Sequence, residues 1–236
     1  MNSAKLPYRI FPLGDAAITI DFGNVIDDTI NQHVLALFYR LSNDPLLGMS
    51  EAVPAYSSIT VYYDIYTTSK KIPAGKTVYE FIHEQLNQRL QQPMPERDTV
   101  SKLVSIPVCY EKEFAPDIEY LARKKNISVD EVIHIHTSKQ YRVYMLGFLP
   151  GFSYMGEVDE KIAMPRKLQP VTVAEGSVGI AGKQTGIYPM TSPGGWQIIG
   201  RTPLKLFNAE NENPTLLKAG DTIQFVSISK NEFENY

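Results

Sequence analysis

Cysteine is almost absent from this sequence: Cys109 is the single one among 236 residues. A lone cysteine excludes an intrachain disulfide, and it excludes zinc sites that are built on several thiolates. Its neighbourhood, Ser105–Tyr110, is typical of a strand, and a free cysteine there is most often buried and inert. The four histidines show no metal-ligand spacing such as His-Glu-x-x-His, so we predict no metal site.

Runs of positive charge and long apolar runs are also missing. Lys and Arg number 23 against 26 Asp and Glu, which leaves a net charge of −3. A nucleic-acid-binding protein normally carries a basic stripe, so we expect no nucleic-acid partner. No window approaches the roughly 18 consecutive apolar residues of a membrane helix, and Met1–Arg9 lacks the apolar run of a secretory signal. We therefore predict a cytoplasmic protein without a membrane partner.

Glycine is scarce in the first 146 residues, which contain only 4 of the 15 glycines. The other 11 begin at Gly147, and 7 of these lie between Gly176 and Gly200. Glycine is used where the backbone turns tightly or where another group must approach it closely. The second half of the chain is therefore expected to differ in architecture from the first.

The first hundred residues alternate between the patterns of helix and strand. Ile30–Leu41 and Val78–Leu90 place apolar residues at the spacing of a helix face, and Ser58–Tyr63 alternates as a strand does. Gln91–Pro95 ends the second helix and is typical of a linker. We predict a small N-terminal α/β sandwich domain over residues 1–97.

From Gln140 onward the helical period disappears, and short apolar segments alternate with glycine and proline turns. Many short strands at this spacing are typical of a barrel or a folded antiparallel sheet. Because 236 residues fit one or two ordinary domains, we predict an α+β protein whose second domain, residues 98–236, is either a barrel or a folded antiparallel sheet.

The segment Ser177–Thr185 approaches a phosphate-binding loop without matching it. That motif requires glycine where Ser177 stands, a hydroxyl residue where Gln184 stands, and a helix directly afterwards. Pro189 and Pro193 follow instead, so we expect no helix and no nucleotide loop.

Polar and aromatic residues accompany these glycines, and their side chains include hydrogen-bond donors suited to amides and carboxylates. They are Lys183, Gln184, Thr185, Tyr188, Ser192, Trp196 and Arg201. The residues alone leave two interpretations open: tight barrel turns, or a groove for a small molecule or a partner.

His134 and His136 are two residues apart in a predicted helix, so they lie on different sides of it. His136 shares the apolar face, which favours a core role over a functional one.

Several blocks of the second half together resemble one known family. They are Ile135-His-Thr137, Gly147-Phe-Leu-Pro-Gly-Phe152, Pro165-Arg166, Gly176-Ser-Val-Gly-Ile-Ala-Gly182, Gln184-Thr-Gly-Ile-Tyr-Pro189, Ser192-Pro-Gly-Gly-Trp196 and Ile199-Gly-Arg-Thr-Pro203. On these blocks the chain resembles the allophanate hydrolase subunit 1 family, also called the KipI/PxpB family. The best supported bacterial role of that family is the B-type subunit of an ATP-dependent 5-oxoprolinase, which opens 5-oxoproline to L-glutamate.

The resemblance implies a cyclophilin-like barrel of the carboxyltransferase subdomain C/D type. It also implies two partners, a C-type subunit and an A-type, lactam-utilisation subunit, with ATP as a cosubstrate of the complex and no tightly bound cofactor. One departure concerns charge: the family's second Pro-Arg is replaced here by Gln169-Pro-Val171, and Glu175 adds a negative charge nearby.

The resemblance further implies roles for individual residues. Arg166 and Arg201 would bind a carboxylate or phosphate. Gln184 and Tyr188 would hydrogen-bond the lactam or a partner's loop, and His136 would orient the site or move a proton. Trp196 would form an apolar wall, and the remaining groove residues would be Phe148, Phe152, Gly182, Thr185, Ser192, Gly194 and Gly195.

Two alternatives stay open beside the oxoprolinase. One is a non-catalytic inhibitor of a sensor histidine kinase, as the KipI-type members of the family are described. The other is a subunit of allophanate or urea carboxylase type, for which biotin would have to be carried by another protein.

Overall fold

The computed structural model describes residues 6–92 and 102–236. The chain divides into two units, Met1–Thr99 and Val100–Tyr236, and each has its own hydrophobic core. The predicted boundary between residues 97 and 98 lies outside the described residues. Within the described ranges, no helix is long and apolar enough to span a membrane.

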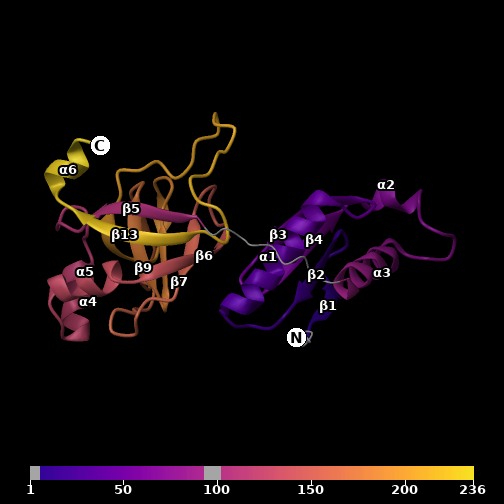
Figure 1. The fold of residues 1–236 in the computed structure, drawn as a ribbon, viewed down its shortest axis with the longest axis horizontal. Helices are drawn as coiled ribbons and strands as arrows, with labels where there is room; N and C mark the ends of the chain where they lie inside the picture. The colour runs from indigo at the N-terminus through magenta and orange to yellow at the C-terminus, as the bar shows by residue number, and fades with distance from the viewer. Residues whose placement is uncertain (1–5, 93–101) are drawn as a thin grey trace. The chain divides into compact units, whose positions relative to one another are not determined.

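The first unit is built on a four-stranded antiparallel sheet in the order β1-β2-β4-β3 (Figure 1). Its strands are β1 Arg9–Pro12, β2 Ala17–Asp21, β3 Met49–Pro54 and β4 Ser58–Tyr63. Its helices are α1 Asp28–Asn43, α2 Ile65–Ser69 and α3 Val78–Gln91. The small α/β domain that the hydrophobic pattern predicts is therefore present.

Local sequence signals explain where the helices of this unit begin. The side chain of Asp27 accepts a hydrogen bond from the N–H of Ile30 at the start of α1. At the start of α3, Thr77 and Glu80 form a complete capping box. One core then joins the buried faces of these helices to the inner face of the sheet, and it includes Ile18, Ile20, Val34, Leu37, Ile59, Val61, Ile82 and Leu86.

Seven strands of the second unit close into a barrel in the order β10-β7-β6-β13-β5-β12-β9. They are β5 Leu103–Cys109, β6 Gln140–Leu146, β7 Ser153–Gly156, β9 Ser177–Ala181, β10 Gln184–Ile187, β12 Gln197–Arg201 and β13 Thr222–Ile228. The neighbours β5 and β13 are parallel, and the other neighbouring pairs are antiparallel. The closed barrel confirms the predicted α+β fold class.

Three helices and a short ribbon complete the second unit. The helices are α4 Ile118–Lys125, α5 Val129–Thr137 and α6 Lys230–Glu234, and the ribbon pairs β8 Val171–Val173 with β11 Ser192–Gly194. Helix α5 packs against β13, and α4 packs against both α5 and β12.

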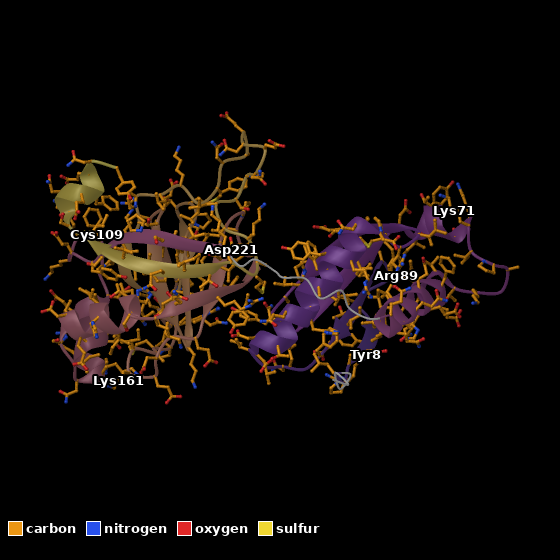
Figure 2. The ribbon with its side chains drawn as sticks, viewed as in Figure 1. Tyr8, Lys71, Arg89, Cys109, Lys161 and Asp221 are labelled. Atoms are coloured by element: carbon orange, nitrogen blue, oxygen red, sulfur yellow. The ribbon has the colours of Figure 1, made fainter. Side chains whose placement is uncertain are left out.

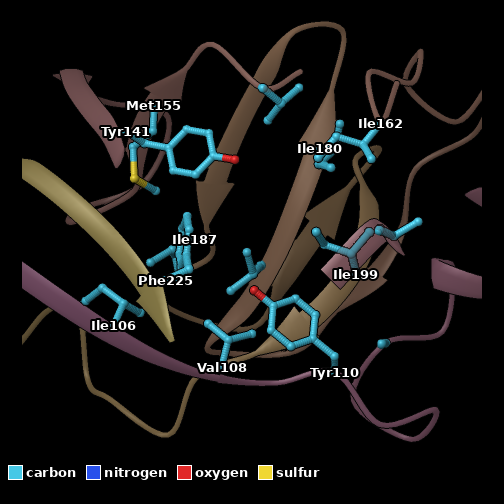
Figure 3. Packing of buried hydrophobic residues seen from close by; sticks show 14 of the residues in the cluster. Ile106, Val108, Tyr110, Tyr141, Met155, Ile162, Ile180, Ile187, Ile199 and Phe225 are labelled. Atoms are coloured by element: carbon cyan, nitrogen blue, oxygen red, sulfur yellow. The ribbon is translucent and has the colours of Figure 1, made fainter. Parts of the chain in front are cut away.

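Large apolar side chains fill the barrel interior. Figure 3 shows Tyr110, Tyr141 and Phe225 among Ile180 and Ile187, and all five are almost fully buried. Cys109, labelled in Figure 2, ends β5. It is buried, as its sequence context predicts. Burial raises the pKa of its thiol, which keeps it protonated and unreactive.

Alternate positions of the same strands point to the opposite side and form a second apolar cluster. On β12, for example, Ile199 belongs to the interior core whereas Ile198 belongs to this outer cluster. The outer cluster consists of Phe152, Val173, Ala181, Tyr188, Trp196 and Ile198. It is the part of the fold that positions the candidate site.

Candidate functional site on the outer face of the barrel

A cavity of about 230 Å³ lies beside the outer cluster. Aromatic residues, small residues and one charged side chain line it: Phe148, Phe152, Tyr154, Arg166, Pro170, Tyr188, Pro193, Gly194, Gly195 and Trp196. Such a mainly apolar cavity with a few polar groups is typical of small-molecule sites.

Two glycines on neighbouring strands make room for the aromatic rings of the pocket. A Cβ atom on Gly186 of β10 would lie 3.0 Å from Cζ3 of Trp196 and 3.1 Å from Cζ of Phe152. A Cβ atom on Gly179 of β9 would lie 3.0 Å from Cβ of Trp196. Carbon atoms in contact normally stay about 3.5–4.0 Å apart. The rings can therefore lie on the sheet only because these positions carry no side chain.

Phe152 is at the centre of the aromatic wall. Its ring centroid lies 4.7 Å from that of Tyr154, 5.1 Å from that of Tyr188 and 5.4 Å from that of Trp196. The rings of Tyr188 and Trp196 stand almost perpendicular to it, at 85° and 84°. Such edge-to-face contacts are favourable in both distance and orientation. The four rings therefore stabilise one another in this arrangement.

Tyr188 brings a polar group to this wall. A Cβ atom on Gly194 would lie 2.7 Å from Cε1 of the tyrosine, so the ring lies directly on the backbone of β11. Burial raises the pKa of the Tyr188 phenol, and a hydrogen bond from the backbone of Trp196 opposes this shift. Tyr188 is thus neutral at physiological pH, and its hydroxyl proton can be donated to a ligand.

Arg166 is the one charged residue among those that line the cavity. Its Cζ atom lies 5.9 Å from the ring centroid of Trp196, within the range of a cation–π interaction. A guanidinium group binds carboxylates and phosphates through paired hydrogen bonds. The pocket therefore suits a small ligand with an anionic group at one end and an apolar or amide-like body.

Phe148 stands at the rim of the pocket with 62% of its surface exposed. The N–H of Leu149 donates to the carbonyl of Gly147 at 2.8 Å, and the φ angle of Phe148 is 69°. These features define a γ-turn of the rare positive-φ type, which strains a residue other than glycine. The backbone thus holds an apolar ring in contact with solvent at the mouth of the pocket.

Seven of the thirteen residues that the sequence assigns to the site line this pocket. They are Phe148, Phe152, Arg166, Tyr188, Gly194, Gly195 and Trp196. The other six are not among its lining residues: His136, Gly182, Gln184, Thr185, Ser192 and Arg201.

His136 lies in the barrel interior, where it is fully buried and stacks on Phe225. Its Nδ1 is 2.8 Å from the hydroxyl of Tyr110, and its Nε2 is 3.1 Å from Oγ1 of Thr185. Oγ1 of Thr185 in turn donates to the carbonyl of Gly179 at 3.1 Å. The structure therefore places His136 and Thr185 together, but on the inner side of the strands.

The direction of this hydrogen-bond chain follows from its last member. A carbonyl only accepts, so the Thr185 hydroxyl uses its proton on Gly179 and must accept from Nε2–H of His136. Nδ1 is then the acceptor for the Tyr110 hydroxyl. Burial lowers the pKa of His136 to about 3, so the ring is neutral at physiological pH. A neutral, enclosed imidazole with both nitrogens engaged lies apart from the residues that line the pocket, which favours a packing role for His136 over proton transfer there.

The remaining assigned residues occupy other parts of the barrel. Gly182 forms the turn between β9 and β10, and Gln184 begins β10 opposite Ala181. Arg201 ends β12, where its Nε donates to the carbonyl of Glu175 at 2.6 Å. Ser192 in β11 is buried, and its hydroxyl has no hydrogen-bond partner among the described residues.

The segment that approaches a phosphate-binding loop forms the hairpin of β9 and β10. Its backbone groups pair between strands, whereas a phosphate loop leads into a helix. This segment therefore lacks the geometry of a loop that binds the phosphates of ATP. In the parts of the chain that the structure describes, no three His, Cys, Asp or Glu residues are grouped so as to hold a metal ion.

Three lining residues are missing from the sequence-based assignment: Tyr154, Pro170 and Pro193. The signal for Tyr154 is its position two residues after Phe152, because alternate residues of a strand share a face. No comparable signal identifies the two prolines, which reach the pocket only through the folding of the loop and ribbon around it.

The chain thus combines a small α/β unit with a closed barrel that carries an aromatic pocket on its outer face. The family model for the carboxyltransferase domain, subdomain C and D, matches residues 8–217, and the chain belongs to this family. It is 44% identical to the B-type subunit of 5-oxoprolinase from Bacillus subtilis over 97% of this chain and 96% of that protein. It is 39% identical to the protein of the same name from Haemophilus influenzae, over 92% and 97% of the two chains.

Longer proteins also contain a region similar to this chain. The crystal structure of TTHA0988 superposes with a TM-score of 0.77 at 33% identity, over 90% of this chain. This chain spans only 40% of that protein. The urea amidolyase of Lachancea kluyveri is 25% identical over 99% of this chain, which covers 14% of that protein.

Proposed function

We propose that this chain is the B-type subunit of an ATP-dependent 5-oxoprolinase, which opens 5-oxoproline to L-glutamate. The observation that carries the proposal is the 44% identity to a 5-oxoprolinase subunit of this type, extending over nearly the full length of both chains. Gln169-Pro-Val171 stands where the family that the sequence resembles has a second Pro-Arg. Arg166 is therefore the cation that lines the pocket.

The pocket offers groups that match the parts of 5-oxoproline. The carboxylate of this ligand would pair with Arg166, and its ring methylenes would pack on Trp196 and Phe152. The hydroxyl of Tyr188 would donate to the lactam oxygen or to an adjacent group. Removing water from this pocket strengthens each of these polar contacts.

The chemistry needs help from outside this pocket, because an unstrained amide resists attack by water. Transfer of the γ-phosphoryl group of ATP to the amide oxygen would create a better electrophile. One water would then add to the carbon and the C–N bond would break, giving a free amine and an acyl phosphate, and a second water would release phosphate and leave glutamate. The role of this chain is to bind and orient the lactam and to neutralise its carboxylate. Catalysis by the complex is thus assigned to this chain together with its partners.

The partners that we propose are a C-type subunit and an A-type, lactam-utilisation subunit. The relatives are named as subunits, and the longer TTHA0988 chain contains this region as 40% of its length. In that longer chain this region is joined covalently to other sequence, which supports the proposal that the separate chain works with a partner.

A subunit of urea carboxylase type is the second candidate, supported by the family match and by the urea amidolyase similarity. The lower identity, 25%, and the 14% share of that protein make it the weaker proposal. Inhibition of a histidine kinase stays a hypothesis from the sequence resemblance alone.

Reconstitution tests the proposal directly. The chain is mixed with the A-type and C-type subunits of the same genome, and glutamate release from 5-oxoproline with ATP is measured. We expect turnover from the complete complex and none when this chain is omitted. Arg166→Ala should raise the KM for 5-oxoproline by about tenfold or more, since it removes a charged hydrogen-bond donor.

Glu113→Gln is a suitable control, because it removes an exposed ion pair with Lys230 away from the lining residues. Its kinetics should match those of the unmodified chain. Turnover by the two other subunits without this chain would contradict the proposal. Carboxylation of urea by a complete complex that ignores 5-oxoproline would favour the second candidate.

A further inference from the structure

Arg166 is the centre of a three-residue strap that is tied down on both sides. The backbone N–H of Lys167 donates to the carbonyl of Gly195 at 2.6 Å. The side-chain amide of Gln197 donates to the carbonyl of Pro165 at 3.0 Å. The strap therefore runs alongside the segment that contains Gly195 and Trp196 and leads into β12.

Asp117 reaches this strap from a position far away in the sequence. It is the N-cap residue of α4, yet its carboxylate makes no capping hydrogen bond to that helix. Instead its Oδ2 lies 2.6 Å from Nζ of Lys167 and accepts from the backbone N–H of Ile198 at 2.7 Å. The N–H of Asp117 also donates to the carbonyl of Ile198 at 3.0 Å. One residue therefore fixes both the strap and β12.

The ion pair between Asp117 and Lys167 is more enclosed than the others among the described residues. Its side chains are 17% and 20% exposed, whereas those of Glu113 and Lys230 are 51% and 40% exposed. An ion pair withdrawn from water interacts more strongly than a surface pair, and removal of one member leaves the other charge poorly solvated. The strap should therefore shift when this pair is broken.

We propose that Asp117 is a positioning residue, which holds Lys167 and thereby keeps the neighbouring Arg166 over Trp196 in the pocket. Lys167 directly follows Arg166 in the chain, so anchoring Lys167 on Asp117 restricts where the Arg166 side chain can lie. The functional part of this inference rests on the proposed role of Arg166 in binding 5-oxoproline. Its structural part concerns this chain alone.

Trp196 provides a readout of the structural part, because it is the one tryptophan of the sequence and is only 4% exposed. In the full chain, Asp117→Asn keeps an acceptor for Ile198 but removes the charge that holds Lys167. Lys167→Met breaks the same ion pair from the other side and serves if the first variant folds poorly. We expect both to shift Trp196 emission to the red and to increase its quenching by acrylamide. Lys167→Arg and Glu113→Gln should leave both unchanged.

A double-mutant cycle in the reconstituted complex tests the functional part. Asp117→Asn alone should raise the KM for 5-oxoproline on the order of tenfold, because a small misplacement of a binding group is costly. In an Arg166→Ala background the same change should add almost nothing, since its effect passes through Arg166.

Each outcome decides a separate point. Unchanged emission and quenching in both ion-pair variants would overturn the positioning role. An Asp117→Asn effect that adds fully to that of Arg166→Ala would overturn the route through Arg166. A complex that is inactive on 5-oxoproline with the unmodified chain would overturn the proposed function, while the fluorescence result would still decide whether Asp117 holds the strap.

Discussion

At the scale of single residues, the side of the strand on which a residue lies decides its role. Thr185 and Gly186 are neighbours in β10, yet Thr185 joins His136 inside the barrel while Gly186 lies beneath Trp196 and Phe152 outside. Sequence motifs mark both positions equally, because a motif names residues without stating which face they occupy. Whether these residues form a binding groove or only tight turns depends on how the barrel closes, which the motifs do not specify.

Two substitutions of Phe148 measure how much its strained backbone lowers the free energy of unfolding. Phe148→Ala and Phe148→Gly both delete the exposed ring, but only glycine adopts a φ of 69° without strain. We expect the glycine variant to be more stable to urea than the alanine variant by about 1 kcal/mol. Equal or reversed stabilities would show that the turn relaxes when the ring is removed.

At the scale of elements, local patterns predict those elements that local forces stabilise. The alternation of Ser58–Tyr63 matches β4, and the capping box at Thr77 begins α3. The strands β7 and β10 have only four residues each and include glycine, so they lack a recognisable alternation. They are neighbours in the barrel wall and pair with each other, a long-range contact that a sequence window does not contain.

The glycine of β10 gives a prediction at this scale. A Cβ atom on Gly186 would lie 2.8 Å from the backbone carbonyl of Ser153, as well as against two aromatic rings. Gly186→Ala should therefore destabilise the chain by about 1–3 kcal/mol and disturb Trp196 emission.

Gly147→Ala is the matched control for this substitution. Its Cβ atom would approach only Cε of Met145, at 3.1 Å, and a methionine side chain moves aside easily. Its urea unfolding curve and its tryptophan emission should stay close to those of the unmodified chain. A Gly186→Ala variant as stable as this control would contradict the close packing of the pocket floor.

At the scale of the whole molecule, the second unit is held together by a core that includes a titratable ring. His136 has a pKa of about 3 in the folded chain and an ordinary value of 6.5 when unfolded. Above pH 6.5 both states are neutral and the stability is complete. Below it the unfolded chain binds a proton that the folded chain does not, so folding becomes less favourable by roughly 1 kcal/mol per pH unit.

The contribution of His136 can be separated from that of other titrating groups by comparison with His136→Gln. Urea unfolding of both chains is measured at pH 8, 6 and 5. The variant should be less stable at pH 8, because the chain of hydrogen bonds to Tyr110 and Thr185 is altered. Its stability should then fall less steeply towards pH 5. Parallel curves would mean that His136 binds its proton in the folded chain.

Closure of the barrel also limits how another protein can recognise the second unit. Every one of its seven strands already has a neighbour on each side, although β5 and β12 pair only at Cys109 and Arg201. Where the strands pair along their length, a partner cannot extend the cylinder by adding a strand, as it could at an open sheet edge. Recognition at these paired strands must depend on side chains, and the most distinctive ones on the wall are the aromatic rings and the guanidinium beside Trp196. Affinity for this wall should therefore respond to individual side-chain substitutions far more than to any change in the backbone.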